Sequence, residues 1–396
     1  MTGEPAHAVE IVDAAEPGSA DPFGLRNLDV EALRRRPGAK WHRPGGRLAA
    51  WVADMDFPIA PIIRDRLVEL ATSDLGYPDW ERAAASPLPP LFAHRMERRY
   101  GWCPQLDRLH ELNDVVQGVR LAIHHLTEPG DRVVLHTPAY TPFLRVIEGM
   151  GRRIVRVPWP FDHERLDLDL QKEPARLLVL CHPHNPTGHV FDRPELEGLA
   201  ELAARHDLVV VSDEIHADLT HDPHVHVPFE SLGPEVSART VTVTSASKSF
   251  NIAGLRWAVL HAGHRGLHDT LAALTEQYFG APNLMAVAAT DAAWTSGDEW
   301  LQEVLAVIDE NRHLLVGLLA EHLPGAVYAI PDATYLAWVD CRPLGLGDEP
   351  AAVFAERGVE VSPGPNFGVE GLGHVRVNLA TSPAVLRRVV ATMGGS

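Results

Sequence analysis

Short apolar runs alternate with helical patterns from about Asn113 to residue 245, and this alternation limits what the chain can fold into. Parallel strands cannot be joined by tight turns and need long crossover connections, usually helices. The pattern therefore predicts an α/β fold with a mostly parallel central sheet flanked by helices, whose ligand lies at the carboxyl ends of the strands. The predicted strands are residues 132–136, 153–157, 177–181, 208–212 and 241–244.

Helix start signals support the same arrangement. Residues 114–126 read as a helix capped by Asn113 or Asp114, and residues 192–205 begin with Asp192 as the cap and a proline in the first turn. Later in the chain, a long amphipathic helix near residues 300–322 and strands at 334–340 and 374–378 indicate a smaller α+β domain. We expect residues 1–50 to form an N-terminal arm and part of the small domain, residues 51–290 the large domain and residues 291–396 the C-terminal small domain.

Size and charge exclude several classes of protein. A chain of 396 residues exceeds what one hydrophobic core usually supports, and a formal net charge of −18 disfavours nucleic acid or an anionic membrane as the main partner. The cysteines, Cys103, Cys181 and Cys341, are widely separated and form no CxxC pair, which disfavours a disulfide framework. No apolar segment approaches the length of a membrane span, and no export signal is recognisable. We therefore expect a cytoplasmic protein.

Three chemically useful residues follow three of the predicted strands. Asn185 follows the run LLVLC, Asp213 follows LVVVS, and Lys248 follows VTVT. Taken singly, Lys248 could be a solvated loop residue, Asp213 a cap, and residues 185–188 (NPTG) a simple turn. Because consecutive parallel strands end at one edge of the sheet, the ordered set is better explained by one shared site.

The combination of lysine, carboxylate and small residues suggests pyridoxal phosphate (PLP). This cofactor uses a lysine amine for its aldehyde, a carboxylate for its ring nitrogen and a cradle for its phosphate. Lys248, Asp213, Ser245 and Arg256 can supply these parts.

The chain also resembles the fold-type I PLP enzymes of the class I/II aminotransferase superfamily, and within them the MalY/PatB-type cystathionine β-lyase branch. The resemblance runs from about Trp51 to Asn378. The segments that look specific to the lyase branch are ADMDFP, SDEIH and SKSFNIAGL, whereas NPTG and SxxK are shared by the whole superfamily. Further matching segments are residues 76–77 (GY), 100–102 (YGW), 138–143 (PAYTPF) and 334–338 (TYLAW).

This resemblance implies a role for each matching residue. Lys248 would bind the cofactor covalently and then move the substrate's α-proton, Asp213 would pair with the ring nitrogen, and Asn185 would bond to the ring hydroxyl oxygen. Tyr140 would stack on the ring. Arg376 would clamp the substrate α-carboxylate together with Asn185 and the backbone amide of Ala53. The phosphate ligands would be Ser245, Arg256, the backbone amides of Gln117, Gly118 and Val119, and Tyr77 from the neighbouring subunit of a homodimer.

Some positions depart from the family pattern. His216 stands where many aminotransferases carry a tyrosine that contacts the ring hydroxyl, although the lyase branch commonly has histidine there. His182 replaces an asparagine, Arg256 is not typical of the lyase branch, and residues 80–90 are unusually rich in proline. These departures leave the substrate's identity open.

Four histidines, His216, His221, His224 and His226, raise the possibility of a metal site, but their segment has no regular register and we expect no metal.

The favoured activity is α,β-elimination from cystathionine or another cysteine S-conjugate to thiol, pyruvate and ammonia. The alternatives are an aminotransferase, an oxygen-dependent decarboxylation and deamination of a cysteine S-conjugate, and a regulatory protein that keeps the fold without turnover.

Overall fold

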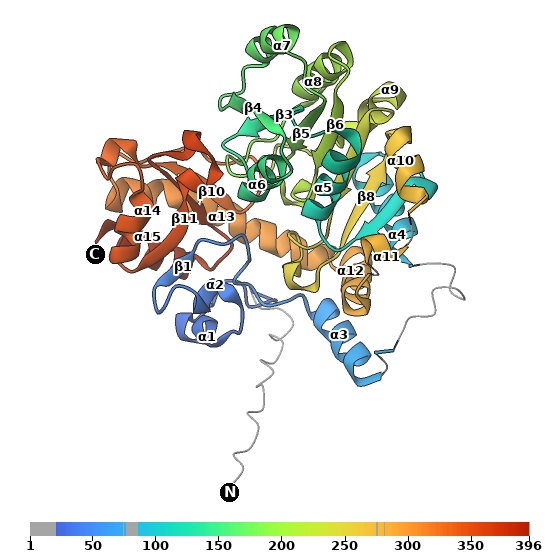
Figure 1. Ribbon diagram of the computed structural model, residues 1–396. Helices are drawn as coiled ribbons and strands as arrows, with labels where there is room; N and C mark the ends of the chain where they lie inside the picture. Colours follow the sequence, from blue (N-terminus) through green and yellow to red (C-terminus); the bar gives the residue numbers. More distant parts are fainter. Residues whose placement is uncertain (1–20, 74, 77–85, 275, 281, 396) are drawn as a thin grey trace, which may run out of the picture.

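The computed structural model describes residues 21–73, 75–76, 86–274, 276–280 and 282–395, and it contains two sheets surrounded by helices (Figure 1). The larger sheet has the strand order β2-β8-β7-β6-β5-β3-β4. Strands β3 to β7 pair in parallel, whereas β8 pairs antiparallel to both β7 and β2. The predicted mostly parallel sheet is therefore confirmed. Its strands are β2 (Leu109–Leu112), β3 (Arg132–Thr137), β4 (Arg153–Pro158), β5 (Leu177–Cys181), β6 (Val209–Asp213), β7 (Thr240–Thr244) and β8 (Ala258–Ala262).

Helices cover both faces of this sheet because its central strands are apolar on both sides. On one face, α5 (Val115–Leu126), α6 (Thr141–Gly149) and α10 (Arg265–Ala272) share a core with the strands. On the other face, α7 (His163–Lys172) and α8 (Arg193–Arg205) do the same. Gly118 lets α5 approach β7, since a Cβ there would lie 2.6 Å from Cγ1 of Val243.

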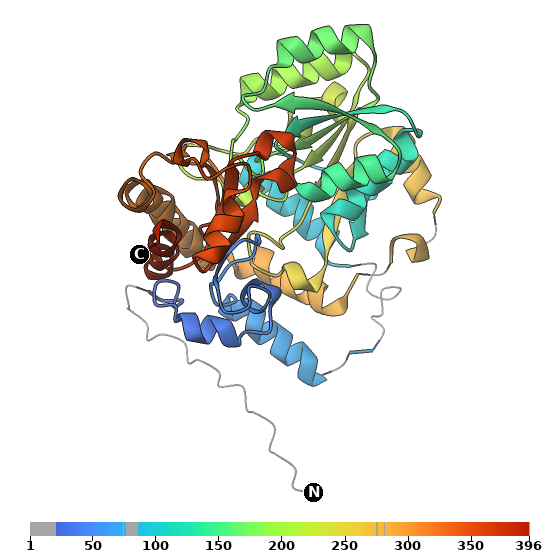
Figure 2. The same ribbon diagram turned by 60° about the vertical axis from the view of Figure 1, so that its left-hand side comes forward.

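The smaller sheet has the order β1-β11-β12-β10-β9. Its edge strand β1 comes from the N-terminal part of the chain and pairs in parallel with β11, with Leu48 opposite Val359. Figures 1 and 2 show the orange and red second sheet beside the blue N-terminal helices. The strands are β1 (Leu48–Ala50), β9 (Val327–Tyr328), β10 (Leu336–Asp340), β11 (Val359–Pro363) and β12 (His374–Asn378).

Helix α13 (Asp298–His322) belongs to two cores at once. Its first half, through Trp300 and Val304, packs with the helices around α12, and its second half, through Leu315 and Leu319, packs beneath the smaller sheet. The remaining α-helices are α1 (Val30–Arg35), α2 (Ala39–His42), α3 (Pro61–Ser73), α4 (Leu88–Tyr100), α9 (Pro234–Ser237), α11 (Glu276–Phe279), α12 (Leu284–Ser296), α14 (Pro350–Glu356) and α15 (Pro383–Gly394).

Several predicted boundaries differ from the structure by one or two residues. Strand β6 runs one residue later than predicted, so Asp213 is its last residue. Strand β10 begins at Leu336 and not at Thr334, because Thr334 adopts a left-handed conformation with φ of 73° that interrupts an extended strand. Within the described ranges, no helix is long and apolar enough to cross a membrane.

Candidate active site

A cavity of about 350 Å³ lies where β5, β6 and β7 end. Asn185, Asp213 and Lys248, each predicted from a strand end, all line it. Four other predicted residues join them in the cavity wall, namely Ala53, Tyr140, His216 and Arg256. The structure therefore brings together most of the predicted site.

Lys248 is held at the cavity wall by a backbone oxygen. Its Nζ donates a hydrogen bond to the carbonyl of Ala53 at 2.7 Å. Burial lowers the pKa of the Lys248 ammonium, and the nearby carboxylate of Asp54 opposes that shift. A lowered pKa favours the neutral amine, which is the form that attacks an aldehyde or accepts a proton. The other two lysines of the chain lie elsewhere, because Lys40 is paired with Asp56 and Lys172 is exposed.

Asp213 is a buried carboxyl group with few protein partners. Its Oδ1 accepts a hydrogen bond from the Ile215 amide at 3.1 Å, and Sγ of Cys181 lies 3.9 Å from its Oδ2. Burial raises the pKa of Asp213 to about 7. A cationic nitrogen placed in the cavity would restore the ionised form, since an opposite charge stabilises a carboxylate. The sequence analysis missed Cys181, whose position opposite Asp213 depends on the pairing of β5 with β6.

Arg376, on β12, points its guanidinium toward the same region. Nη1 donates to Oδ1 of Asn185 at 3.0 Å, and Nη2 donates to the carbonyl of Trp51 at 3.0 Å and to Oγ of Ser362 at 3.2 Å. The guanidinium also lies 4.8 Å from the centre of the Phe367 ring, and burial lowers the pKa of Arg376 to about 10. Nε is buried and has no partner among the described residues. A substrate carboxylate is a suitable partner for that unused donor.

Tyr140 and His216 form further parts of the cavity wall. Tyr140 is the N-cap residue of α6 and is partly buried, as expected for an aromatic ring that could stack on a flat cofactor. Burial, followed by the charges of Lys248 and Arg376, lowers the pKa of His216 to about 3. The imidazole is therefore neutral, and its buried Nδ1 has no partner among the described residues.

Helix α5 presents its first turn to the cavity, at the end where we expect the phosphate. Gln117, one of the three predicted residues, lines the cavity together with Val115 and Val116, whereas Gly118 and Val119 are buried against the sheet. The reason is that α5 begins at Val115, and the free amides of a helix are those of its first turn. Arg256 pairs with Asp114, the N-cap residue of that helix.

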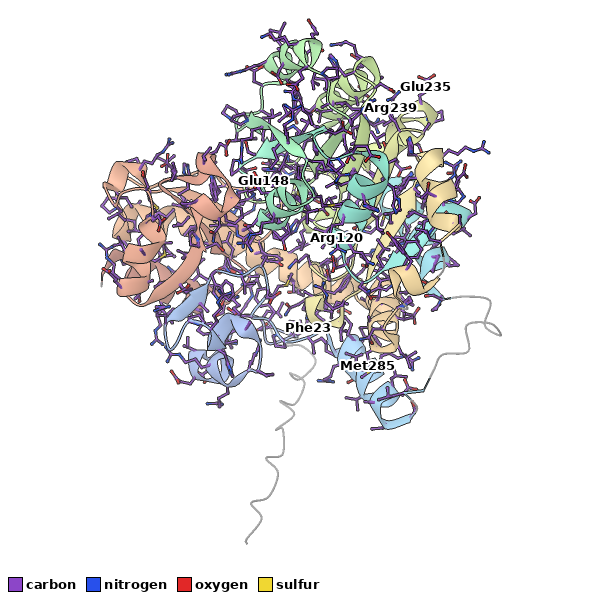
Figure 3. The ribbon with its side chains drawn as sticks, in the orientation of Figure 1. Phe23, Arg120, Glu148, Glu235, Arg239 and Met285 are labelled. Carbon is purple, nitrogen blue, oxygen red and sulfur yellow. The ribbon has the colours of Figure 1, made fainter. Side chains whose placement is uncertain are left out.

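Ser245 lies behind the cavity wall. Its hydroxyl donates to the carbonyl of Trp257 at 2.6 Å and accepts from the amide of Ser247 at 3.0 Å, and Ser247 lines the cavity in its place. Arg120, an exposed residue of α5 labelled in Figure 3, also lines the cavity and was not predicted. Tyr77 lies outside the described residues.

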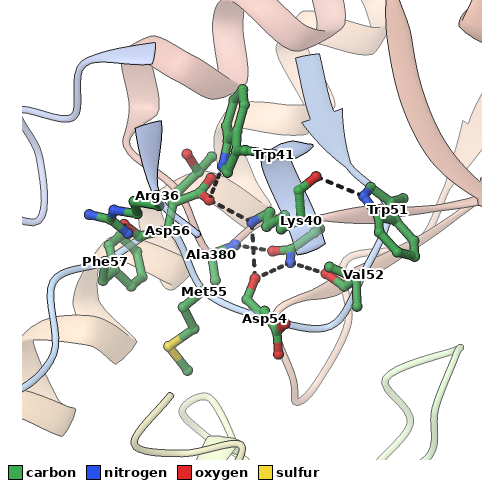
Figure 4. Close-up of polar contacts among 12 residues, drawn as sticks. Arg36, Lys40, Trp41, Trp51, Val52, Asp54, Met55, Asp56, Phe57 and Ala380 are labelled. Carbon is green, nitrogen blue, oxygen red and sulfur yellow. Dashed lines mark hydrogen bonds and ion pairs between the residues drawn. The ribbon is translucent and has the colours of Figure 1, made fainter. Parts of the chain in front are cut away.

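The segment that carries Ala53 is tied to both sides of the site. Asn378 donates to the carbonyls of Val52 and Asp54, each at 2.6 Å, and Asn251 accepts from the amide of Met55 at 3.0 Å. Figure 4 shows this segment with the buried ion pair between Lys40 and Asp56, whose charged atoms are 3.0 Å apart.

These asparagines lie close in sequence to Lys248 and Arg376. The contacts explain why the ADMDFP segment belongs to the site.

Three of the four histidines considered as metal ligands bind different partners, and the fourth, His216, lines the cavity. His221 bonds to the carbonyl of Thr334, His224 pairs with Asp332, and His226 pairs with Glu214. Among the residues described, no group of three or more metal-ligating side chains is placed to hold an ion.

The donor set of the cavity fits the cofactor expected from the sequence. The same space is surrounded by one amine, an aromatic ring, the first turn of a helix and one buried carboxyl group that forms no ion pair with any described residue. The residues available to hold PLP are therefore Lys248, Asp213, Asn185, Tyr140 and the start of α5.

Comparisons with known proteins agree with this site. Residues 112–393 match the family model described as aminotransferase class I and II. Cystathionine β-lyase PatB of Bacillus subtilis is 35% identical over 377 residues, which cover 89% of this chain and 96% of that protein. Protein MalY of Escherichia coli is 32% identical over 352 residues, which cover 86% of this chain and 89% of that protein.

A solved structure gives the same result. The PLP-bound C–S lyase from Staphylococcus hominis has a TM-score of 0.83 and 27% identity, and the match covers 91% of this chain and 96% of that one. The chain therefore belongs to the aminotransferase class I and II family, in the branch that includes PatB and MalY.

Proposed function

We propose that the protein is a PLP-dependent carbon–sulfur β-lyase that cleaves cystathionine or another cysteine S-conjugate. The observation that carries this proposal is that Lys248, Asp213 and Tyr140 surround one cavity while Arg376, beside it, contacts Asn185 of the same cavity. The relatives named as cystathionine β-lyase and C–S lyase support the choice of reaction.

Bound PLP would supply an electron sink that makes the α-proton of an amino acid acidic enough to remove. Asp213 would keep the cofactor's ring nitrogen protonated, because a buried carboxylate and an adjacent cation stabilise each other's charged forms. Asn185 would bond to the hydroxyl oxygen at the edge of the ring, and Tyr140 would stack on the face of the ring.

Arg376 and Asn185 would fix the substrate carboxylate, and thereby the direction of the bond to the α-proton. Lys248, with its lowered pKa and its Nζ beside the Ala53 carbonyl, would accept that proton. In the overall reaction, the cysteine S-conjugate and one water give a thiol, pyruvate and ammonium. The Cβ–S bond breaks with its electron pair leaving on sulfur, and the sulfur takes up a proton.

The assembly and location belong to the same proposal. We propose a homodimer in which Tyr77 reaches the phosphate of the partner's cofactor, and a cytoplasmic location, in keeping with the widely separated cysteines.

The experiment is a product assay on the purified protein supplied with PLP. Cystathionine and several S-alkyl cysteines are offered as substrates, while thiol, pyruvate and ammonia are measured together. We expect the three products in equal amounts. No pyruvate from any conjugate, with conversion of amino acids only when a keto acid is present, would replace the proposal with an aminotransferase.

An aminotransferase is the second candidate because the matched family is described by that activity and the residues that hold cofactor and carboxylate would be the same. The two reactions differ in what happens after the α-proton is removed. Dioxygen consumption measured in the same assay tests the oxygen-dependent alternative.

A further inference from the structure

A second cavity, of about 290 Å³, adjoins the first. Tyr140 lines both cavities, and Arg376 lines the second. A substrate whose α-carboxylate is held by Arg376 and whose amine faces Lys248 therefore lies between them. The second cavity is the space into which the rest of such a substrate can extend.

Two charged residues of this second cavity, Glu360 and Arg43, differ in whether an opposite charge is paired with them. Glu360 is paired with Arg47, whose Nη2 lies 2.9 Å from Oε2 of the carboxylate. Arg43 is exposed and has no ion pair or side-chain hydrogen bond within the described part of the chain. We assign Arg376 to the α-carboxylate of the substrate. The remaining charge of this cavity that no partner compensates is therefore the positive charge of Arg43.

Arg43 is also held in position. Its guanidinium carbon lies 5.0 Å from the centre of the Trp51 ring, and Trp51 is fixed in turn by a hydrogen bond of 2.9 Å from its Nε1 to the carbonyl of Lys40. A guanidinium stacked on an aromatic face keeps its N–H donors free at its edge. Such a group is ready to bind a carboxylate.

Two hydroxyl groups of the cavity are already used within the protein. Oγ1 of Thr141 donates to the carbonyl of Asn366 at 2.7 Å, and the Ser362 hydroxyl donates to the carbonyl of Trp51. The guanidinium of Arg43 is consequently the strongest available donor for a distal group of the substrate.

We propose that the second cavity binds the substituent on the substrate sulfur, and that Arg43 makes the enzyme favour cysteine S-conjugates whose departing thiol carries a carboxylate. This inference rests on the proposed lyase function and adds the class of its substrate. Arg43 acts as a specificity-determining residue, whereas Arg376 recognises the α-carboxylate that all amino-acid substrates share.

The test compares two substrates of nearly equal size and shape, S-(2-carboxyethyl)-L-cysteine and S-(2-carbamoylethyl)-L-cysteine. The values of kcat/KM are measured from thiol release for the wild-type protein and for Arg43→Gln. We expect the acid-to-amide ratio of kcat/KM to fall about two- to fivefold in Arg43→Gln, which is the effect of losing an exposed ion pair. Arg43→Lys, which keeps the charge, is expected to retain part of the preference.

Two further variants sharpen the result. Arg47→Gln leaves Glu360 unpaired in the cavity and is expected to lower the same ratio, because the free carboxylate repels an anionic substituent. Arg265→Gln is the matched control, since Arg265 is 84% exposed on α10 and does not line either cavity. Its ratio is expected to equal that of the wild type.

The possible failures are distinguishable. Thiol release from both conjugates with an unchanged ratio in Arg43→Gln would overturn this inference and leave the lyase function intact. A wild-type preference for the amide, or for conjugates with apolar substituents, would also overturn it and would indicate an apolar role for Trp51 and Phe367. No thiol release from any conjugate would overturn the lyase function and this inference with it.

Discussion

Nη1 of Arg376, on a strand of the smaller sheet, lies 3.0 Å from Oδ1 of Asn185, in the loop that follows β5 of the larger sheet. Asn185, which we assign to the cofactor ring, therefore orients Arg376, which we assign to the substrate carboxylate. The same guanidinium also bonds to the carbonyl of Trp51, next to the segment that holds Lys248. We therefore expect substrate and cofactor to be positioned through shared side chains.

Replacement of Arg376 by lysine is expected to weaken substrate binding more than catalysis. Lysine keeps the charge but cannot donate two parallel hydrogen bonds to a carboxylate. We expect KM for amino-acid substrates to rise about 10- to 100-fold, as for the loss of a hydrogen bond to a charged group, with a smaller change in kcat. Steady-state kinetics measure the effect. Arg342→Gln, at a surface arginine paired with Asp340, is the control. An unchanged KM in Arg376→Lys would remove Arg376 from the substrate site.

Replacement of Lys248 by alanine is expected to abolish turnover. The variant loses both the amine that binds the cofactor covalently and the group that moves the α-proton, and general acid–base catalysis alone contributes about 10²- to 10⁴-fold. We expect pyruvate formation to fall by at least that factor and the visible absorption of the lysine-bound cofactor to disappear. Lys172→Ala, at an exposed lysine of α7, is expected to keep both signals. Retained covalent cofactor in Lys248→Ala would contradict the assignment.

Asp213 is expected to make the cofactor-free protein less stable as pH rises. Burial raises the pKa of this carboxyl group to about 7 in the folded state, against about 3.9 in an unfolded chain, so the folded state binds more protons between these values. Its contribution to the free energy of unfolding therefore falls by about 1.4 kcal/mol per pH unit from pH 4 to pH 7.

Thermal unfolding at several pH values measures this contribution. Asp213→Asn is expected to raise the Tm of the cofactor-free protein at pH 8 and to leave it nearly unchanged at pH 4. With PLP bound, the cationic ring nitrogen is expected to remove the advantage of the variant. Equal Tm values at pH 8 for the two cofactor-free proteins would show that Asp213 ionises without a cationic partner.

Asp56→Asn is expected to destabilise the fold strongly. The substitution leaves the ammonium of Lys40 buried without its counter-charge, and removal of one member of a buried ion pair costs about 3–5 kcal/mol. Urea unfolding measures the loss. The exposed pair of Arg66 and Glu69 on α3 provides the control, since Glu69→Gln is expected to change stability by less than about 0.5 kcal/mol. A similar small effect of Asp56→Asn would show that the charge of Lys40 is compensated without Asp56.

Most of the larger sheet could be predicted from the sequence because its strands are short apolar runs separated by capped helices. Asp192 caps α8 as predicted, and α5 is capped by Asp114, one of the two candidates that the sequence offered. The convergence of Asn185, Asp213 and Lys248 also followed from strand order, since parallel strands end at one edge.

Other parts of the site could not be predicted in this way. The position of the phosphate-facing amides depends on the residue at which α5 begins, and the sequence left two candidates for its cap. Cys181 lies beside Asp213 through the register in which β5 pairs with β6, and the sequence does not specify that register. The neighbouring cavity with Arg43 combines residues before β1, after β11 and at the start of α6.

The sequence by itself determined the class of the fold, which functional residue follows which strand, and the chemistry of the expected cofactor. These depend on local apolar patterns and on short motifs. Only the tertiary structure decided which donors are free, which charges are compensated and how the pKa values of Asp213 and His216 shift. Those properties depend on burial and on contacts between segments up to about 300 residues apart, such as the hydrogen bond between Arg376 and Trp51, and no local pattern encodes them.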